Sequence, residues 1–169
     1  MANMFLSLTG VTGESIDADK KLEGAIEIHE WVWGLHNAAP YRLKESDATT
    51  HASVDKMTVT KMIDKASVTL VNFCAHGKEV SKATITCRKN TEDGPVDYLT
   101  IELNDVKIRS VNWPGRGEDL RGVPEVVVLE FKKFTMSYSM QLASGLLEGA
   151  NVFPFDIPEQ KGQPAKPGK

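Results

Sequence analysis

The chain has 169 residues, of which 41% are hydrophobic, and its formal net charge is -3. A chain of this size suits one domain, which buries roughly 70% of the surface of its unfolded state. The acidic balance and the lack of a Lys/Arg cluster argue against a nucleic-acid partner. No apolar run in the sequence is long enough to span a bilayer, so membrane insertion is not expected either.

The first stretch, MANMFLSLTGV, predicts a strand rather than a secretory signal. It lacks a basic n-region, and Ser7 and Thr9 interrupt its short apolar run. The apolar residues alternate along residues 4–8 and stop before Gly10, as expected for a β-strand. We therefore expect no cleaved signal peptide.

A second strand is predicted in GAIEIHEWVWGLHN, residues 24–37, but its alternation changes phase in the middle. Ile26 and Ile28 point to one face, and the opposite face carries Trp31, Trp33 and Leu35. A half-solvated strand shows one apolar and one polar face. Two apolar faces therefore require a second burial partner.

The next segment, residues 38–56, is polar, lacks periodicity and exceeds the usual loop length within compact domains. Residues 57–63, MTVTKMI, then alternate as a strand. One helix is predicted at about residues 66–76, where apolar residues recur at helical spacing and a glycine follows. Asp64 or Ser67 can accept the first free backbone N–H groups of this helix.

Two later strands repeat the change of phase. Residues 97–113 shift at Asn104, and residues 125–139 shift after Phe131, whereas residues 83–88 alternate regularly. β-Bulges or strong coiling produce such shifts where a strand bends from one sheet into another. The sequence therefore predicts a mainly β fold, a bent-strand β-barrel of two packed sheets with one flanking helix and long loops.

The C-terminal end carries several prolines and glycines without periodicity. Such a composition favours an irregular segment over a packed element. We expect a single domain over residues 1–153 and a flexible tail over residues 154–169.

Motifs that carry catalysis or bind a cofactor are weak in this sequence. Cys74 and Cys87 lack metal or disulfide spacing and are expected to be small buried hydrophobic residues. Cys74 and His76 are two apart on the predicted helix, so their side chains diverge by about 200° and cannot act as nucleophile and base. SVDK, residues 53–56, fits an S-x-x-K pattern that arises often by chance. We predict no catalytic residue, no metal and no cofactor, and therefore no enzyme.

Six segments together form a recognisable pattern: residues 4–15, 26–34, 60–78, 83–90, 97–113 and 125–139. Their most telling pieces are Gly-Glu-Ser at residues 13–15, Trp-x-Trp-Gly at residues 31–34, and Ile-Asp-Lys-Ala-Ser at residues 63–67. In order and spacing the six segments resemble the haemolysin-coregulated proteins, Hcp, of bacterial type VI secretion systems, and the resemblance covers roughly residues 4–139. Each piece is weak alone, but all six in register are specific.

The resemblance implies a β-barrel that forms a homo-hexameric ring. Such rings stack ring on ring into the inner tube of the secretion machine and can carry effectors in their lumen. The implied partners are the type VI sheath, the spike protein and secreted effectors. The implied path leads from the bacterial cytoplasm to the outside through the machine, without a cleaved signal peptide.

The resemblance also gives the two faces of residues 24–37 separate roles. One face would pack the barrel core, and the other would line the lumen or meet a neighbouring subunit. We expect Glu30 and Val32 to face lumen or cargo, with the barrel core formed by Trp31, Trp33 and Leu35. Relatives often carry a small polar residue where this chain has Val32, so the choice of cargo is not carried over. The candidates for ring stacking lie in the long loop: Leu43, Lys44, Glu45, Ser46 and Asp47.

Two other classes of function stay open at this point. A monomeric β-barrel that binds a small ligand in its interior would keep the second strand face polar. An acyl-transfer or thiol enzyme would need a base within reach of Cys74 or Ser53, and the sequence offers none. The native mass separates these alternatives, since a ring has six times the subunit mass.

Overall fold

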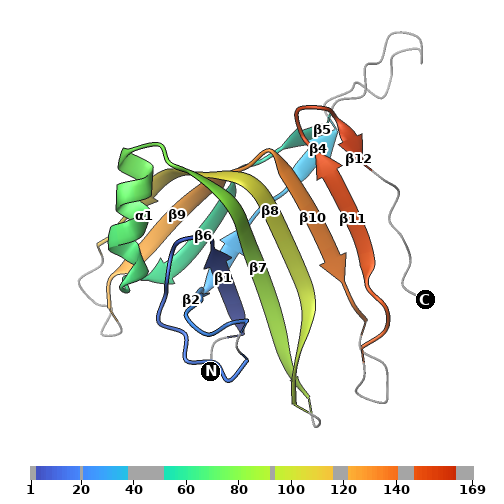
Figure 1. The fold of residues 1–169 in the computed structure, drawn as a ribbon, viewed down its shortest axis with the longest axis horizontal. Coiled ribbons are helices and arrows are strands. Elements are labelled where there is room, and N and C mark those ends of the chain that lie inside the picture. Colours follow the sequence, from blue (N-terminus) through green and yellow to red (C-terminus); the bar gives the residue numbers. More distant parts are fainter. Residues whose placement is uncertain are drawn as a thin grey trace.

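The computed structural model describes residues 3–19, 21–37, 52–91, 94–115, 122–140 and 147–162. These residues form mainly β-structure with one α-helix (Figure 1). In chain order the elements are β1 (Met4–Leu8), β2 (Ile26–Glu27), β3 (Glu30–Val32), β4 (Leu35–Asn37), β5 (Ala52–Val54), β6 (Met57–Met62), α1 (Ala66–Ala75), β7 (Glu79–Thr91), β8 (Gly94–Asn112), β9 (Pro124–Glu130), β10 (Lys133–Tyr138), β11 (Asn151–Asp156) and β12 (Lys161–Gly162).

Most strands belong to one strongly bent antiparallel sheet. One branch runs in the order β12-β11-β10-β8-β7-β1-β2, and a second branch continues from β8 through β9 and β6 to β3. The long strand β8 joins the branches, because residues 99–104 pair with β10 while residues 107–112 pair with β9. β4 and β5 form a separate two-stranded sheet.

The bend in β8 lies at the predicted change of phase. Leu103 and Val106 are both fully buried although they are three residues apart. Asp105 between them has a φ of +55°, in the left-handed region that non-glycine residues rarely adopt. This residue shifts the alternation by one position, so apolar side chains on both halves of the strand face the core. The predicted phase shift is confirmed.

The second predicted shift separates two strands. Phe131 and Phe134 are both buried, one after β9 and the other within β10. The backbone N–H of Lys132, at the turn, donates to the carbonyl of Asn104 at 3.1 Å. The chain therefore changes direction here beside the bend of β8, and one predicted strand is two.

The mainly β fold with one flanking helix is confirmed, but the sheet is not closed into a barrel. β2 pairs with β1 and ends at Glu27, whereas β3 pairs with β6 and begins at Glu30. Between them, Ile28 and His29 each donate one backbone hydrogen bond, to β1 and to β6 respectively. The expected closure fails because the ladder is interrupted at this change of partner.

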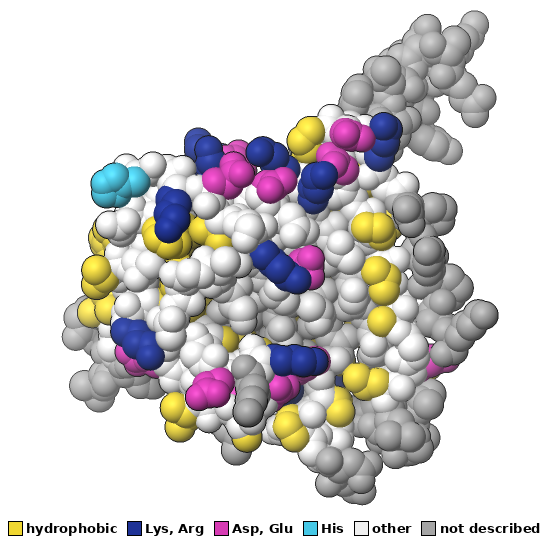
Figure 2. All heavy atoms as spheres, viewed as in Figure 1, with side chains coloured by type: hydrophobic (Ala, Val, Ile, Leu, Met, Phe, Trp, Pro, Cys, Tyr) yellow, Lys and Arg dark blue, Asp and Glu magenta, His cyan; other side chains and the backbone are white. Residues whose placement is uncertain are grey.

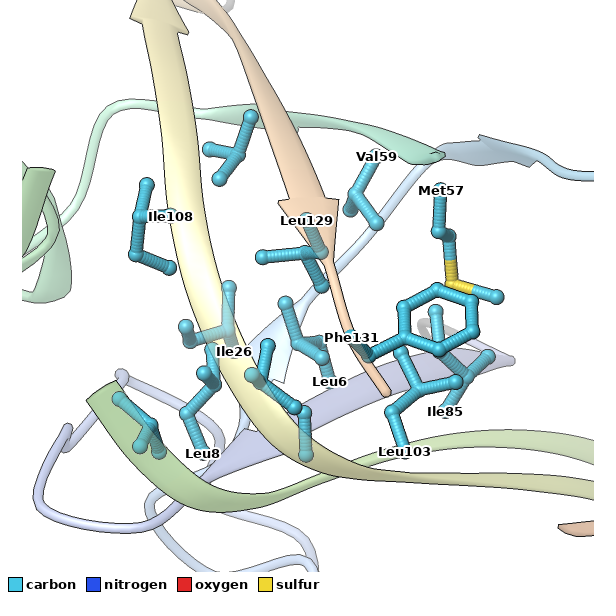
Figure 3. Packing of buried hydrophobic residues seen from close by; sticks show 14 of the residues in the cluster. Leu6, Leu8, Ile26, Met57, Val59, Ile85, Leu103, Ile108, Leu129 and Phe131 are labelled. Atoms are coloured by element: carbon cyan, nitrogen blue, oxygen red, sulfur yellow. The ribbon is translucent and has the colours of Figure 1, made fainter. Parts of the chain in front are cut away.

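Apolar side chains from both branches of the sheet fill the space they enclose (Figure 3). Leu70 and Phe73 of α1 belong to the same cluster. Leu6, Ile85, Leu103 and Leu129 have no exposed surface. Their contacts replace hydration with close packing, which supplies most of the favourable free energy of folding. Because these described side chains fill the interior, the alternative of a barrel with an internal ligand is not favoured.

The helix was predicted at about residues 66–76 and is found at Ala66–Ala75, so this prediction is confirmed. Asp64 Oδ1 accepts the N–H of Ala66 at 2.9 Å, and Ser67 Oγ accepts the N–H of Asp64 at 3.1 Å. Gly77 follows the helix with a φ of +60°. Leu70 and Phe73 bury the inner face of the helix in the core.

The expected tail of residues 154–169 contains β-structure in its described part, residues 154–162. Residues 151–156 form β11, which pairs along its length with β10, and β12 follows. Phe155 in this strand packs against Phe134, with ring centroids 5.6 Å apart. A strand at residues 151–156 is not predicted from the sequence, because Pro154 has no backbone N–H to donate to a neighbouring strand and a proline argues against a strand. Residues 163–169 lie outside the described residues.

Candidate assembly surfaces

The two cysteines, Cys74 and Cys87, are free thiols. Cys87 is buried, and this burial raises the pKa of its thiol, while Cys74 is partly buried in α1. The described parts of the chain contain no group of three or more His, Cys, Asp or Glu residues that could hold a metal ion. Among the same residues, no helix is long and apolar enough to cross a membrane.

The Gly-Glu-Ser segment connects the first loop to the start of the helix. Glu14 accepts the backbone N–H of Lys65 at 2.9 Å, which satisfies one of the free donors at the beginning of α1. A side chain on Gly13 would collide with the backbone carbonyl of Ala25. Ser15 is buried and its backbone N–H donates to the same carbonyl at 3.1 Å. The motif therefore builds the scaffold.

The segment before α1 is held by a buried ion pair. Lys61 and Glu125 are fully buried, and their Nζ and Oε2 atoms are 2.7 Å apart. Lys61 also donates to Asp64 at 2.8 Å, and Glu125 accepts from Ser67 and from the indole N–H of Trp113 at 2.9 Å each. This network pins the start of α1 to β6 and β9. Local sequence patterns do not reveal this network, because Lys61 and Glu125 are 64 positions apart in the chain.

The two neighbouring tryptophans lie partly buried against the core. The ring of Trp33 meets Phe134 edge to face at 4.8 Å, and its indole N–H donates to the carbonyl of Asp55 at 3.1 Å. Leu35 is 52% exposed, so its assignment to the core is wrong. The chain leaves the main sheet after Val32, and within the described part of the chain no second layer covers Leu35 in the small β4–β5 sheet.

The outward side of β3, β6, β9 and the end of β8 forms one candidate surface, the outer sheet face. Val32 is 59% exposed and Glu30 is exposed, on the side opposite to Trp31. The strand registers align Val32 with Thr58 and Glu30 with Thr60. We define the face by two cross-strand rows, of which Glu30 is the single charged member: Val32, Thr58, Val128 and Ser110, and Glu30, Thr60, Val126 and Asn112.

A second candidate surface surrounds the exposed side of the helix, and we call it the α1 face. It comprises Ile63, Val68, Val71, Trp113 and Val123, each at least 36% exposed. Val68 is 78% exposed, and Ala66–Ala75 contains no charged residue. Figure 2 shows hydrophobic side chains along the left edge of the molecule, where Figure 1 places α1. A solvated helix normally carries charged and polar residues on this side.

The upper edge of the molecule has the opposite character. There Figure 2 shows Lys and Arg interspersed with Asp and Glu. Lys133 pairs with Asp156 at 2.9 Å, and each partner shifts the other: the pKa of Lys133 is raised and that of Asp156 is lowered, mainly by this hydrogen bond. Because the Lys133 side chain is half exposed, this pair contributes little to stability.

The predicted stacking residues, Leu43 to Asp47, lie outside the described residues, as does the rest of segment 38–51. Residues 52–54 of the same predicted loop form β5 and pair with β4. The loop is therefore shorter than expected at its C-terminal end.

Comparison with known proteins gives a consistent result over most of the chain. The family model described as "Type VI secretion system effector, Hcp" matches residues 5–138. Protein hcp1 of Pseudomonas aeruginosa is 31% identical over 150 residues, which cover 89% of this chain and 91% of that protein.

Solved structures agree. Hcp1 from Salmonella typhimurium has a TM-score of 0.76 at 27% identity and covers 96% of this chain and 100% of its own. A type VI secretion system effector from Yersinia pestis has a TM-score of 0.71 at 29% identity, with coverage of 91% and 99%. A further type six secretion system protein shares the fold, with a TM-score of 0.86 at 21% identity and coverage of 96% and 100%. The chain thus belongs to the Hcp family of type VI secretion system proteins.

Proposed function

We propose that this protein is the tube subunit of a type VI secretion system. Six copies form a ring, rings stack into the inner tube, and the lumen holds effectors. Family membership supports this proposal. The observation that carries it is the α1 face, because a monomeric domain rarely exposes such a contiguous apolar surface to water.

The composition of the α1 face favours a contact with another molecule. β-Branched residues are weak helix formers, so helix formation does not explain Val68 and Val71 on the exposed side. Contiguous exposed apolar surface is characteristic of association sites. A closed ring of identical subunits uses two different patches, one on each flank, and the α1 face is our candidate for one of them.

A single charge on the α1 face tests the ring. In native mass spectrometry the wild type should have six times the subunit mass of 18.6 kDa. Val68→Asp should remain folded by circular dichroism, because residue 68 is exposed, but should be monomeric, because burying an unpaired carboxylate is costly. Asn90→Asp adds the same charge at an exposed residue of β7 and should leave the hexamer intact.

Two results would contradict this reasoning. A hexameric Val68→Asp would remove the α1 face from the subunit contact. A wild type that is monomeric at every concentration would reject the ring itself.

Within the ring, we assign the outer sheet face to the lumen. Its side chains are small, and Glu30 and Val32 stand out from it, so passing or bound effectors would meet them. Leu43 to Asp47 remain our candidates for ring stacking, with the sheath and the spike protein as further partners. In this proposal the protein is made in the bacterial cytoplasm and leaves through the machine without a cleaved signal.

Val32→Gln tests the lumen assignment. A glutamine at a position that is 59% exposed should be hydrated in a wide lumen, so the hexamer should persist while co-purification of effectors changes. Val32→Thr, which keeps the side-chain shape, is the matched control for folding. If Val32→Gln gives monomers, position 32 lies in a packed subunit contact, where an unpartnered amide costs about 1–3 kcal/mol.

A further inference from the structure

The small β4–β5 sheet needs support from the rest of the molecule. Each of its strands has three residues, and a two-stranded hairpin is marginally stable in water. Leu35 is 52% exposed, so apolar burial contributes little at this position. In Figure 1 the two strands lie beside β12 at one end of the molecule, away from α1. We call this pair of strands the arm.

The base of the arm is fixed by two hydrogen bonds. The indole N–H of Trp33 donates to the carbonyl of Asp55 at 3.1 Å, and the N–H of Asp55 donates to the carbonyl of Gly34 at 2.9 Å. Both bonds lie where the arm leaves the main sheet. They therefore leave its far end, at Asn37 and Ala52, to be fixed by other contacts.

At that far end, the side chain of Gln160 binds the backbone of β5. Its Oε1 accepts the N–H of Ala52 at 2.8 Å, and its Nε2 donates to the carbonyl of Ala52 at 3.2 Å. The side-chain amide thus satisfies both backbone groups of one residue, as a neighbouring strand would do. Nε2 also donates to the carbonyl of Ile157 at 2.9 Å, which fixes the orientation of the amide.

The turn that carries Gln160 is anchored to the main sheet. The N–H of Ile157 donates to the carbonyl of Lys132 at 2.9 Å, and β12 pairs with β11 directly after the turn. Gln160 has a φ of +51°, a conformation that glutamine rarely adopts. A residue held in this conformation against its preference is characteristic of a position that the surrounding structure determines.

We propose that Gln160 is a latch: its side-chain amide ties the arm to the C-terminal segment, residues 151–162. The C-terminal segment thereby holds β5 at Ala52, the end of the arm that lies farther from the Trp33–Asp55 bond. This inference goes beyond the proposed function and does not depend on ring assembly.

Hydrogen exchange of the full chain, read by mass spectrometry at one protein concentration, tests the latch. Gln160→Ala removes both bonds to Ala52, so exchange in residues 52–54 should accelerate about tenfold, the equivalent of one lost hydrogen bond. Exchange in β7 and β8 should not change. Glu159→Ala is the matched control, because Glu159 lies in the same turn and its side chain pairs with Lys161 rather than with the arm.

A second variant separates the amide from the backbone of the turn. Gln160→Gly tolerates the positive φ but has no amide, so its exchange in residues 52–54 should match that of Gln160→Ala. Wild-type protection of residues 52–54 in either variant would overturn the latch. Acceleration that is equal in β5, β7 and β8 would also overturn it, since the residue would then stabilise the whole fold rather than the arm.

Discussion

Replacing Lys61 by methionine should destabilise the fold more than any comparable surface change. The ammonium group is fully buried and makes four short contacts. It donates to Glu125 at 2.7 Å, to Asp64 and the carbonyl of Met62 at 2.8 Å each, and to Ser67 at 3.0 Å. Methionine fills a similar volume but leaves the carboxylate of Glu125 buried without its cation.

The expected loss follows from this burial. Removing one partner of a buried pair costs about 3–5 kcal/mol, because the remaining charge has lost its compensation. We expect about 4 kcal/mol for Lys61→Met, since Glu125 keeps only the Ser67 and Trp113 donors. Native domains are stable by about 5–15 kcal/mol, so the variant should fold but with a clearly lower urea midpoint.

A double-mutant cycle with Glu125→Leu identifies the interaction. The double variant should lose less than the sum of the single losses, by at least about 1 kcal/mol, because it leaves no unpaired carboxylate at position 125. Lys132→Met is the control: Lys132 is half exposed and lies 3.6 Å from Glu79, so its loss should stay below about 1 kcal/mol. Additive single losses, or a Lys61→Met that is as stable as Lys132→Met, would refute the buried pair as a source of stability.

Two further substitutions test the first loop. Arg88→Met should cost about 3 kcal/mol in urea unfolding, since the guanidinium group is buried and binds three aspartates. One of them is Asp19, whose pKa is lowered by the backbone N–H of Lys21 and by Arg88. A carboxyl group whose pKa is lowered by folding stabilises the protein above its ordinary pKa of 3.8, and this stability is lost as the pH falls through the pKa of the folded state. The loss of stability in acid should therefore be smaller in Arg88→Met than in the wild type. Equal losses in the two proteins would contradict this role of Arg88. Gly13→Ala should cost about 1–3 kcal/mol because its methyl group meets a backbone carbonyl, whereas Gly115→Ala, in open space, should be neutral; equal melting temperatures would contradict the steric argument.

Local patterns predicted the helix and the bends well. The helix of residues 66–75 could be predicted from its own apolar spacing, the acceptor Asp64 and the glycine that follows it. The bend at Asp105 was visible as a change of phase, because alternation along a strand records which side chains face the core. These features depend on residues close together in the chain.

Partners far apart in the chain were invisible to the same reasoning. The pairing of Lys61 with Glu125 and the contact of Gln160 with Ala52 join residues 64 and 108 positions apart. The alternation of apolar residues shows on which face of a strand a side chain lies, but not whether another part of the chain covers that face. Leu35 has the spacing of a core residue, yet it is exposed because the chain leaves the sheet before reaching it.

By itself, then, the sequence determined the mainly β class, the helix, the bends and, through six short segments in register, the resemblance to Hcp. The tertiary structure decided which apolar residues are covered, that the sheet does not close, and that residues 151–156 form a strand despite Pro154. The reason is physical. Side-chain periodicity and the hydrogen bonds within a helix act over a few residues, whereas strand pairing and burial depend on which distant strand lies alongside.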